Sequence, residues 1–169
     1  MNRDLLIIGA GQYGMVAKEI AESMRCFDKI DFLDDKSPLA IGKVSEYKCF
    51  LEKYHCAFVA IGNSNVRLGF LRDLEEAGYH ISTLISPLAS VSPTARIMQG
   101  SIVEPMAVVQ AFSDVGVGCL VCAGAVIKHN AIVEDGCYID CNAVVMPDTV
   151  VQTGTKVSAN SVLALQINI

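Results

Sequence analysis

A six-residue repeat fills the second half of the sequence and constrains the fold more than any other feature. Thirteen consecutive repeats run from Ile85 to Ser161, each with Ile or Val at the first position and a small residue at the fifth. The first-position residues are Ile85, Val91, Ile97, Val103, Val109, Val115, Val121, Ile127, Val133, Ile139, Val145, Val151 and Val157. A fixed short period of this kind indicates a solenoid built from stacked units.

The chemistry of the repeat predicts the shape of each unit. The first and fifth residues lie on the same side of an extended chain, because side chains alternate along a strand. From Gly118 onward the fourth position holds only Gly, Asn or Asp, which tolerate a left-handed backbone. Each repeat therefore predicts one short strand and one sharp corner. Three repeats make a coil of 18 residues, and the stacked coils form a triangular prism of parallel β-structure with Ile and Val inside.

The first half of the sequence has a different pattern. Strands are predicted at residues 5–8, 30–33, 56–61 and 80–85, a helix after the first strand, a helical piece at 45–53, and a helix from Ser64, as its N-cap, to Ala77. Strands that alternate with helices favour a parallel sheet covered by helices. We therefore predict an α/β, Rossmann-like domain at residues 1–85 and an all-β domain of hexapeptide repeats at residues 86–169.

Composition excludes several classes of function. The net charge of -5 argues against a nucleic-acid partner. No apolar run reaches the roughly 18 residues of a transmembrane helix, so no membrane insertion is expected. Seven cysteines without a signal peptide predict reduced thiols and a cytoplasmic protein. Cys119 occupies an inward position of its repeat while Cys122 should face outward, so the pair predicts no metal site.

A glycine-rich turn suggests an anion-binding site in the first domain. Gly9, Gly11 and Gly14 follow a predicted strand and open a predicted helix. Such a turn lets backbone N–H groups approach a phosphate at a helix N-terminus, although it can also be a tight turn without a ligand. Asp34 lies 20 residues beyond Gly14, where dinucleotide-binding folds place the acid that holds a ribose. An NAD-binding module is therefore one alternative.

His129 is the candidate catalytic residue. It is the one histidine of the repeat region and occupies an outward corner whose equivalents in the adjacent coils are Ala111 and Pro147. It is either a solvated corner residue or a general base suited to acyl transfer near neutral pH. In the second case, a corner backbone N–H would stabilise the oxyanion, and a cyclic homotrimer would supply the walls that one corner lacks.

Taken together, these landmarks resemble a known family. The order of the glycine loop, Phe32-Leu-Asp-Asp35, Ala60-Ile-Gly-Asn63 with Arg67, Leu84-Ile-Ser-Pro87 and the repeats carrying His129 is similar to the bacterial sialic-acid O-acetyltransferase and nucleotide-amino-sugar N-acetyltransferase family (NeuD/PglD type). The resemblance implies a left-handed β-helix and acetyl-CoA as co-substrate, bound between prisms of a homotrimer, with no metal. It also implies His129 as the base, with Asn130 beside it.

The resemblance further implies a nucleotide-sugar site in the first domain. The implied substrate-binding residues are Gly9, Gly11, Gln12, Tyr13, Gly14, Asp34, Asp35, Lys36, Ile61, Gly62 and Asn63. The expected reaction is acetyl transfer from acetyl-CoA to a nucleotide-linked amino sugar or to a sialic acid. The other alternative is a nucleotide-sugar-binding or scaffold protein with a shortened β-helix, because no Gly-x-Pro-Ala segment follows the repeats.

Overall fold

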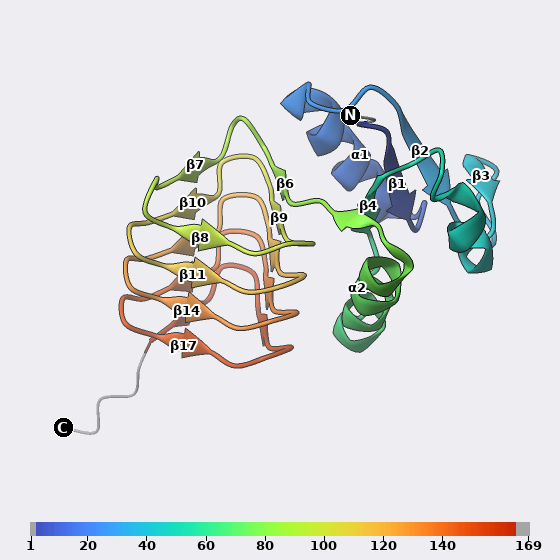
Figure 1. Cartoon of the computed structure of the whole chain (residues 1–169). Coiled ribbons are helices and arrows are strands. Elements are labelled where there is room, and N and C mark those ends of the chain that lie inside the picture. The colour runs from blue at the N-terminus through green and yellow to red at the C-terminus, as the bar shows by residue number, and fades with distance from the viewer. Residues whose placement is uncertain (1–2, 165–169) are drawn as a thin grey trace. The chain divides into compact units, whose positions relative to one another are not determined.

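The chain divides into two compact units, Met1–Leu84 and Ile85–Ile169, and the computed structural model describes residues 3–164 (Figure 1). The first unit is a five-stranded parallel sheet in the order β3-β2-β1-β4-β5. Its strands are β1 (Leu5–Ile8), β2 (Ile30–Leu33), β3 (Ala40–Gly42), β4 (Cys56–Val59) and β5 (His80–Ile81). All four residues of β1 are fully buried, as expected of a central strand that is covered on both faces. The predicted parallel α/β sheet is confirmed.

Two α-helices and one 3-10 helix complete this unit. They are α1 (Gln12–Met24), α2 (Ser64–Ala77) and η1 (Val44–Phe50). Helix α2 ends at Gly78, which adopts the left-handed conformation with φ 102°. Within the described residues, no helix is both long enough and apolar enough to cross a membrane.

Several boundaries predicted from the sequence are wrong. The N-cap of α2 is Asn63, whose Oδ1 accepts a hydrogen bond from the N–H of Val66 at 3.0 Å, and not Ser64. The strand predicted at 80–85 is two strands, β5 and β6 (Leu84–Ile85), which belong to different sheets. Strand β3 was not predicted, and its pairing with β2 contains a register shift. The break between β5 and β6 and the strand β3 depend on which neighbouring strand the backbone pairs with, and local patterns do not show this.

The second unit is built from two-residue strands in three parallel sheets (Figure 1). Its strands are β6 and then β7 (Ser90–Val91), β8 (Arg96–Ile97), β9 (Ile102–Val103), β10 (Val108–Val109), β11 (Asp114–Val115), β12 (Leu120–Val121), β13 (Val126–Ile127), β14 (Ile132–Val133), β15 (Tyr138–Ile139), β16 (Val144–Val145), β17 (Val150–Val151), β18 (Lys156–Val157) and β19 (Val162–Leu163). Each strand pairs with the strand one coil away, as Val121 does with Val103 and Ile139. The predicted β-helix is confirmed, and its left hand stays a prediction from the resemblance.

The interior and the corners follow the repeat. First-position and fifth-position side chains form one continuous core, in which Val121, Ile127 and Ile139 are fully buried. All eight predicted corner positions from Gly118 to Asn160 have φ between 56° and 70°. Two bulky residues, Met106 (φ 64°) and Phe112 (φ 57°), also adopt the left-handed conformation, which the sequence did not predict. Stacking on the adjacent coils therefore imposes the corner conformation even where the side chain disfavours it.

Cys119 and Cys122 lie in different environments. Cys119 belongs to the β-helix core, whereas Cys122 does not. Only 2% of the Cys122 surface is accessible, so this residue is covered even though it lies outside the β-helix core. Burial, followed by the nearby Glu104 carboxyl, raises the pKa of the Cys122 thiol. That the pair holds no metal stays a prediction.

Matched Ile to Ala substitutions test the inward and outward positions of the prism. Ile127 is fully buried and Ile132 is 43% exposed. Ile127→Ala should lower the free energy of unfolding by about 2–5 kcal/mol, because it leaves a cavity in the core. Ile132→Ala should cost roughly 1 kcal/mol or less. Denaturant unfolding followed by circular dichroism measures both, and equal losses would contradict the assignment of the core.

Candidate nucleotide and acyl-transfer sites

The three glycines of the loop between β1 and α1 have different structural roles. Gly9 adopts φ 102°, and a Cβ added there would lie 2.9 Å from the carbonyl oxygen of Ala60. A Cβ at Gly14 would overlap the carbonyl oxygen of Gly9. Only Gly11, the N-cap of α1, has open space, with nothing within 4 Å of an added Cβ. Packing therefore explains Gly9 and Gly14, while Gly11 is where a ligand can approach the backbone at the start of the helix.

Asp34 ties the glycine loop to the end of β2. Its Oδ2 accepts a hydrogen bond from the N–H of Ala10 at 2.8 Å. Its Oδ1 accepts from the N–H groups of Lys36 and Ser37 at 2.8 and 2.9 Å. These bonds, with that of Ala10 the strongest, lower the pKa of the Asp34 carboxyl. The geometry gives Asp34 a role in holding the loop, which the sequence did not predict.

The predicted substrate-binding residues Ile61, Gly62 and Asn63 follow β4. Arg67 of α2 is fully buried, and its Nη1 donates to the carbonyl oxygens of Ile61 and Gly62 at 2.7 and 2.9 Å. The next residue, Asn63, caps α2. A buried arginine therefore fixes the turn in which these predicted residues lie. In the sequence, Arg67 was only one of the residues that carry the family resemblance.

The predicted substrate-binding segments meet at one edge of the first sheet. Strands β1, β2 and β4 are adjacent and parallel, so the segments that follow them leave the same carboxyl edge. Of the other predicted residues, Gln12, Asp35 and Lys36 are exposed. The hydroxyl oxygen of Tyr13 is buried, which leaves that atom little access to a ligand.

His129 lies on an exposed corner of the β-helix beside a groove of about 570 Å³. The groove is lined by Ser90, Val91, Ser92, Pro93, Val108, Val109, Gln110, Ala111 and His129. The backbone N–H of His129 donates to Oε1 of Gln110 at 3.2 Å. Gln110 was missed in the sequence, although its separation from His129, one coil plus one residue, was a usable signal.

Asn130 contributes conformation to this corner. Its φ is 58°, and its N–H donates to the carbonyl oxygen of Ala111 at 3.1 Å. It is not among the residues that line the groove. The structure thus gives Asn130 a reason to be present as a left-handed corner residue. Its predicted catalytic role stays a prediction.

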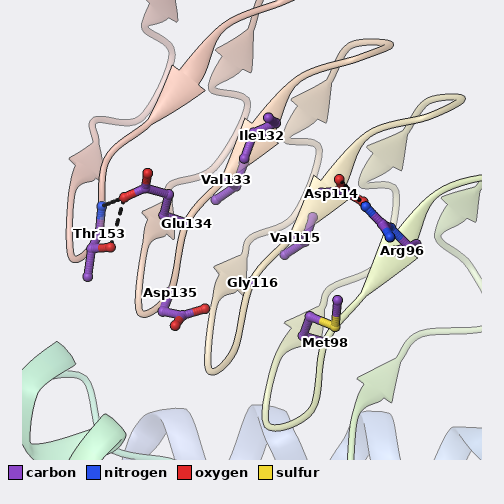
Figure 2. Close-up of a pocket in the computed structure, with 10 residues that line it drawn as sticks. All are labelled: Arg96, Met98, Asp114, Val115, Gly116, Ile132, Val133, Glu134, Asp135 and Thr153. Atoms are coloured by element: carbon purple, nitrogen blue, oxygen red, sulfur yellow. Dashed lines mark hydrogen bonds and ion pairs between the residues drawn. The ribbon is translucent and has the colours of Figure 1, made fainter.

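A second hollow, of about 340 Å³, lies over β8, β11 and β14 (Figure 2). Arg96 and Asp114 form a bidentate ion pair across it at 2.5 and 2.6 Å. Glu134 accepts hydrogen bonds from the N–H and hydroxyl of Thr153, both at 2.8 Å. Each of these charged groups already has a partner within the β-helix, and the residues that line the hollow include no histidine. The groove beside His129 is therefore the better candidate for acyl transfer.

The fold and the two sites define a class of protein: a parallel α/β unit with a glycine-rich turn, joined to a β-helix that carries an exposed histidine. Residues 4–74 match the model of the PglD N-terminal domain. The family resemblance predicted from the sequence is confirmed by this match and by the solved structures below.

Several solved structures, three of them from different organisms, resemble nearly the whole chain. The acetyltransferase domain of PglB from Neisseria gonorrhoeae FA1090, in complex with acetyl coenzyme A, is 29% identical with a TM-score of 0.87, over 97% of this chain and 92% of that chain. A mutant perosamine N-acetyltransferase from Caulobacter crescentus, in complex with CoA and GDP-perosamine, is 21% identical with a TM-score of 0.83, over 95% and 88%. WeeI from Acinetobacter baumannii AYE is 20% identical with a TM-score of 0.65, over 95% and 91%. The last two show the fold.

Asp34→Asn tests whether this carboxylate holds the glycine loop. The lowered pKa means that Asp34 stabilises the fold above its unfolded value of about 3.9, and that this contribution disappears as the pH falls through the folded value. Asp34→Asn should therefore melt at a lower temperature than wild type at pH 7, and the difference should shrink below about pH 4. Thermal unfolding against pH measures this, with the exposed Asp73→Asn as control. A difference that is constant with pH would contradict the role.

Proposed function

We propose that the chain transfers an acetyl group from acetyl-CoA to the amine of a nucleotide-linked amino sugar, with His129 as general base. The observation that carries this proposal is the position of His129 on a groove of the β-helix. The likeness of nearly the whole chain to a PglB acetyltransferase domain bound to acetyl coenzyme A supports it. The first domain, residues 1–85, would bind the nucleotide sugar, and residues 86–169 would carry the transfer.

The reaction needs a general base for the amine and a hydrogen-bond donor for the oxyanion. The amine nitrogen attacks the thioester carbon, a C–N bond forms, and the carbonyl π electrons move to oxygen. His129 takes a proton from the nitrogen as the attack proceeds. The tetrahedral intermediate then collapses, the C–S bond breaks, and the CoA thiolate leaves with the proton from the imidazolium. An imidazole suits both steps, because it exchanges a proton near neutral pH.

The carboxyl edge of the first sheet suits the diphosphate group of a nucleotide sugar. The open space at Gly11 admits a phosphate to the N-terminus of α1, where the helix dipole favours negative charge. The exposed Asp35 and Lys36 would contact the nucleotide, and Ile61 to Asn63 would form the opposite wall. Asp34 already accepts three backbone hydrogen bonds, which disfavours the ribose-binding role that an NAD site requires.

His129→Ala tests the assignment of the base. The chain is incubated with acetyl-CoA and a panel of UDP- and GDP-linked 4-amino sugars, including GDP-perosamine. Released CoA is measured by chromatography, because the exposed Cys49 and Cys141 would react with thiol reagents. Loss of a general base should lower kcat by about 10²–10⁴-fold. His80→Ala, which removes an exposed histidine of the first unit, should leave kcat unchanged.

Two outcomes would count against this function. Equal rates for wild type and His129→Ala would remove His129 from the mechanism. Calorimetry that detects nucleotide-sugar binding but no acetyl-CoA binding would favour the alternative of a non-catalytic nucleotide-sugar-binding or scaffold protein.

The exposed position of His129 predicts a homotrimer. One corner offers few walls to a substrate, and a neighbouring prism in a cyclic assembly would enclose it. Size-exclusion chromatography with light scattering should give a mass three times the 18.1 kDa of the chain. A mass equal to that of one chain would contradict the trimer and leave the site open to solvent.

A further inference from the structure

The backbone N–H groups from Lys128 to Ala131, on either side of His129, are all engaged in hydrogen bonds. Lys128 donates to Val145 O (3.0 Å), His129 to Gln110 Oε1 (3.2 Å), Asn130 to Ala111 O (3.1 Å) and Ala131 to Lys128 O (3.3 Å). The equivalent of His129 in the next coil is Pro147, which has no N–H. The residues around His129 therefore offer no free backbone N–H for the oxyanion, and neither does Pro147 in the next coil.

The side chain of Gln110 supplies a donor instead. Its Oε1 accepts from the N–H of His129, which fixes which end of the amide is oxygen and which is nitrogen. The Nε2 group, with two N–H donors, is then at the other end of the amide. Gln110 and His129 line the same groove. Within residues 3–164, no protein group accepts a hydrogen bond from this nitrogen, so it is available to a ligand.

Comparison with two other corners shows what is unusual about Gln110. Corner N–H groups are capped in the same way by Glu104 at Ala123 (3.0 Å) and by Glu134 at Thr153 (2.8 Å), each from 19 residues earlier. A carboxylate makes the stronger cap, because its hydrogen bond is charge-assisted. The corner with the histidine has a glutamine at this position. Glutamine keeps the cap, adds a donor and removes a negative charge.

We propose that Nε2 of Gln110 donates to the thioester carbonyl oxygen of the acyl donor and stabilises the oxyanion that forms as His129 deprotonates the amine. This inference rests on the proposed acetyl transfer. In this proposal Gln110 is a catalytic residue whose amide has two functions. Its Oε1 accepts the hydrogen bond from the N–H of His129, and its Nε2 faces the oxygen on which negative charge develops. A preorganised donor of this kind acts mainly on the transition state.

Gln110→Glu separates the two functions. The carboxylate should keep the cap on His129, as Glu104 and Glu134 do at their corners, but it cannot donate and it carries a negative charge. With acetyl-CoA and the amino-sugar panel, kcat should fall by about 10²–10³-fold. The KM values should change little, because the lost interaction strengthens only in the transition state. Gln110→Met, which removes the donor without adding charge, should lose a similar factor in kcat.

Three controls make the result specific. Glu134→Gln makes the reverse exchange at another corner and should keep wild-type kcat. Amide hydrogen exchange at His129 should stay slow in Gln110→Glu and become faster in Gln110→Met, which shows that the cap is kept in the first variant. Ala111→Pro removes the backbone N–H of another residue that lines the groove. Proline should fit at this corner, because the equivalent residues of the coils before and after are Pro93 and His129, and that of the coil after His129 is Pro147.

Each outcome decides between defined alternatives. Wild-type kcat in Gln110→Glu would overturn the inference and leave acetyl transfer by His129 standing. Loss of kcat in Ala111→Pro with normal kcat in Gln110→Glu would assign the oxyanion to the backbone of Ala111. A wild-type chain that transfers no acetyl group to any sugar of the panel would overturn the proposed function and this inference together.

Discussion

Stacking of identical positions from coil to coil is the constraint on which the β-helix depends. Each inward Ile or Val lies on its equivalent in the adjacent coils, as Val103, Val121 and Ile139 do. The core that results is continuous from coil to coil, and it forces a sharp turn after every strand. Those turns adopt a left-handed backbone even at Met106 and Phe112, where the side chain opposes it. The gain from burial in the core outweighs these local costs.

The same register also places the candidate catalytic groups. Outward positions stack as regularly as inward ones, so a side chain reaches the corner one coil above it. Gln110 meets the N–H of His129 in this way, just as Glu104 meets Ala123 and Glu134 meets Thr153. A solenoid with no extruded loop can therefore build a site from residues far apart in sequence, because its period makes them neighbours. The backbone at His129 does not have to differ from that of the other corners.

The sequence predicted what is local or periodic. The repeat from Ile85 predicted the strands, the core and the glycine and asparagine corners, because each depends on a few adjacent residues. It could not predict that residues 80–85 split between two sheets, since the apolar run is continuous through the break. Met106 and Phe112 lack the chemistry of corner residues. The roles of Asp34 and Gln110 arise from hydrogen bonds to Ala10 and His129, which are distant in the sequence, so no local pattern shows them. Arg67 bonds to the nearby Ile61, but its burial against that turn is set by the fold.

Both units use polar side chains in the same manner, to hold turns by hydrogen bonds to the backbone. Asp34 and Arg67 hold the turns around the open backbone at Gly11, and Gln110 holds the corner of His129. The function proposed for the chain is acetyl transfer from acetyl-CoA to a nucleotide-linked amine, with His129 as the general base. Mass spectrometry of the nucleotide sugar after incubation with acetyl-CoA tests it most directly. The sugar amine should carry one acetyl group, and an unmodified sugar from a chain that binds both ligands would rule this function out.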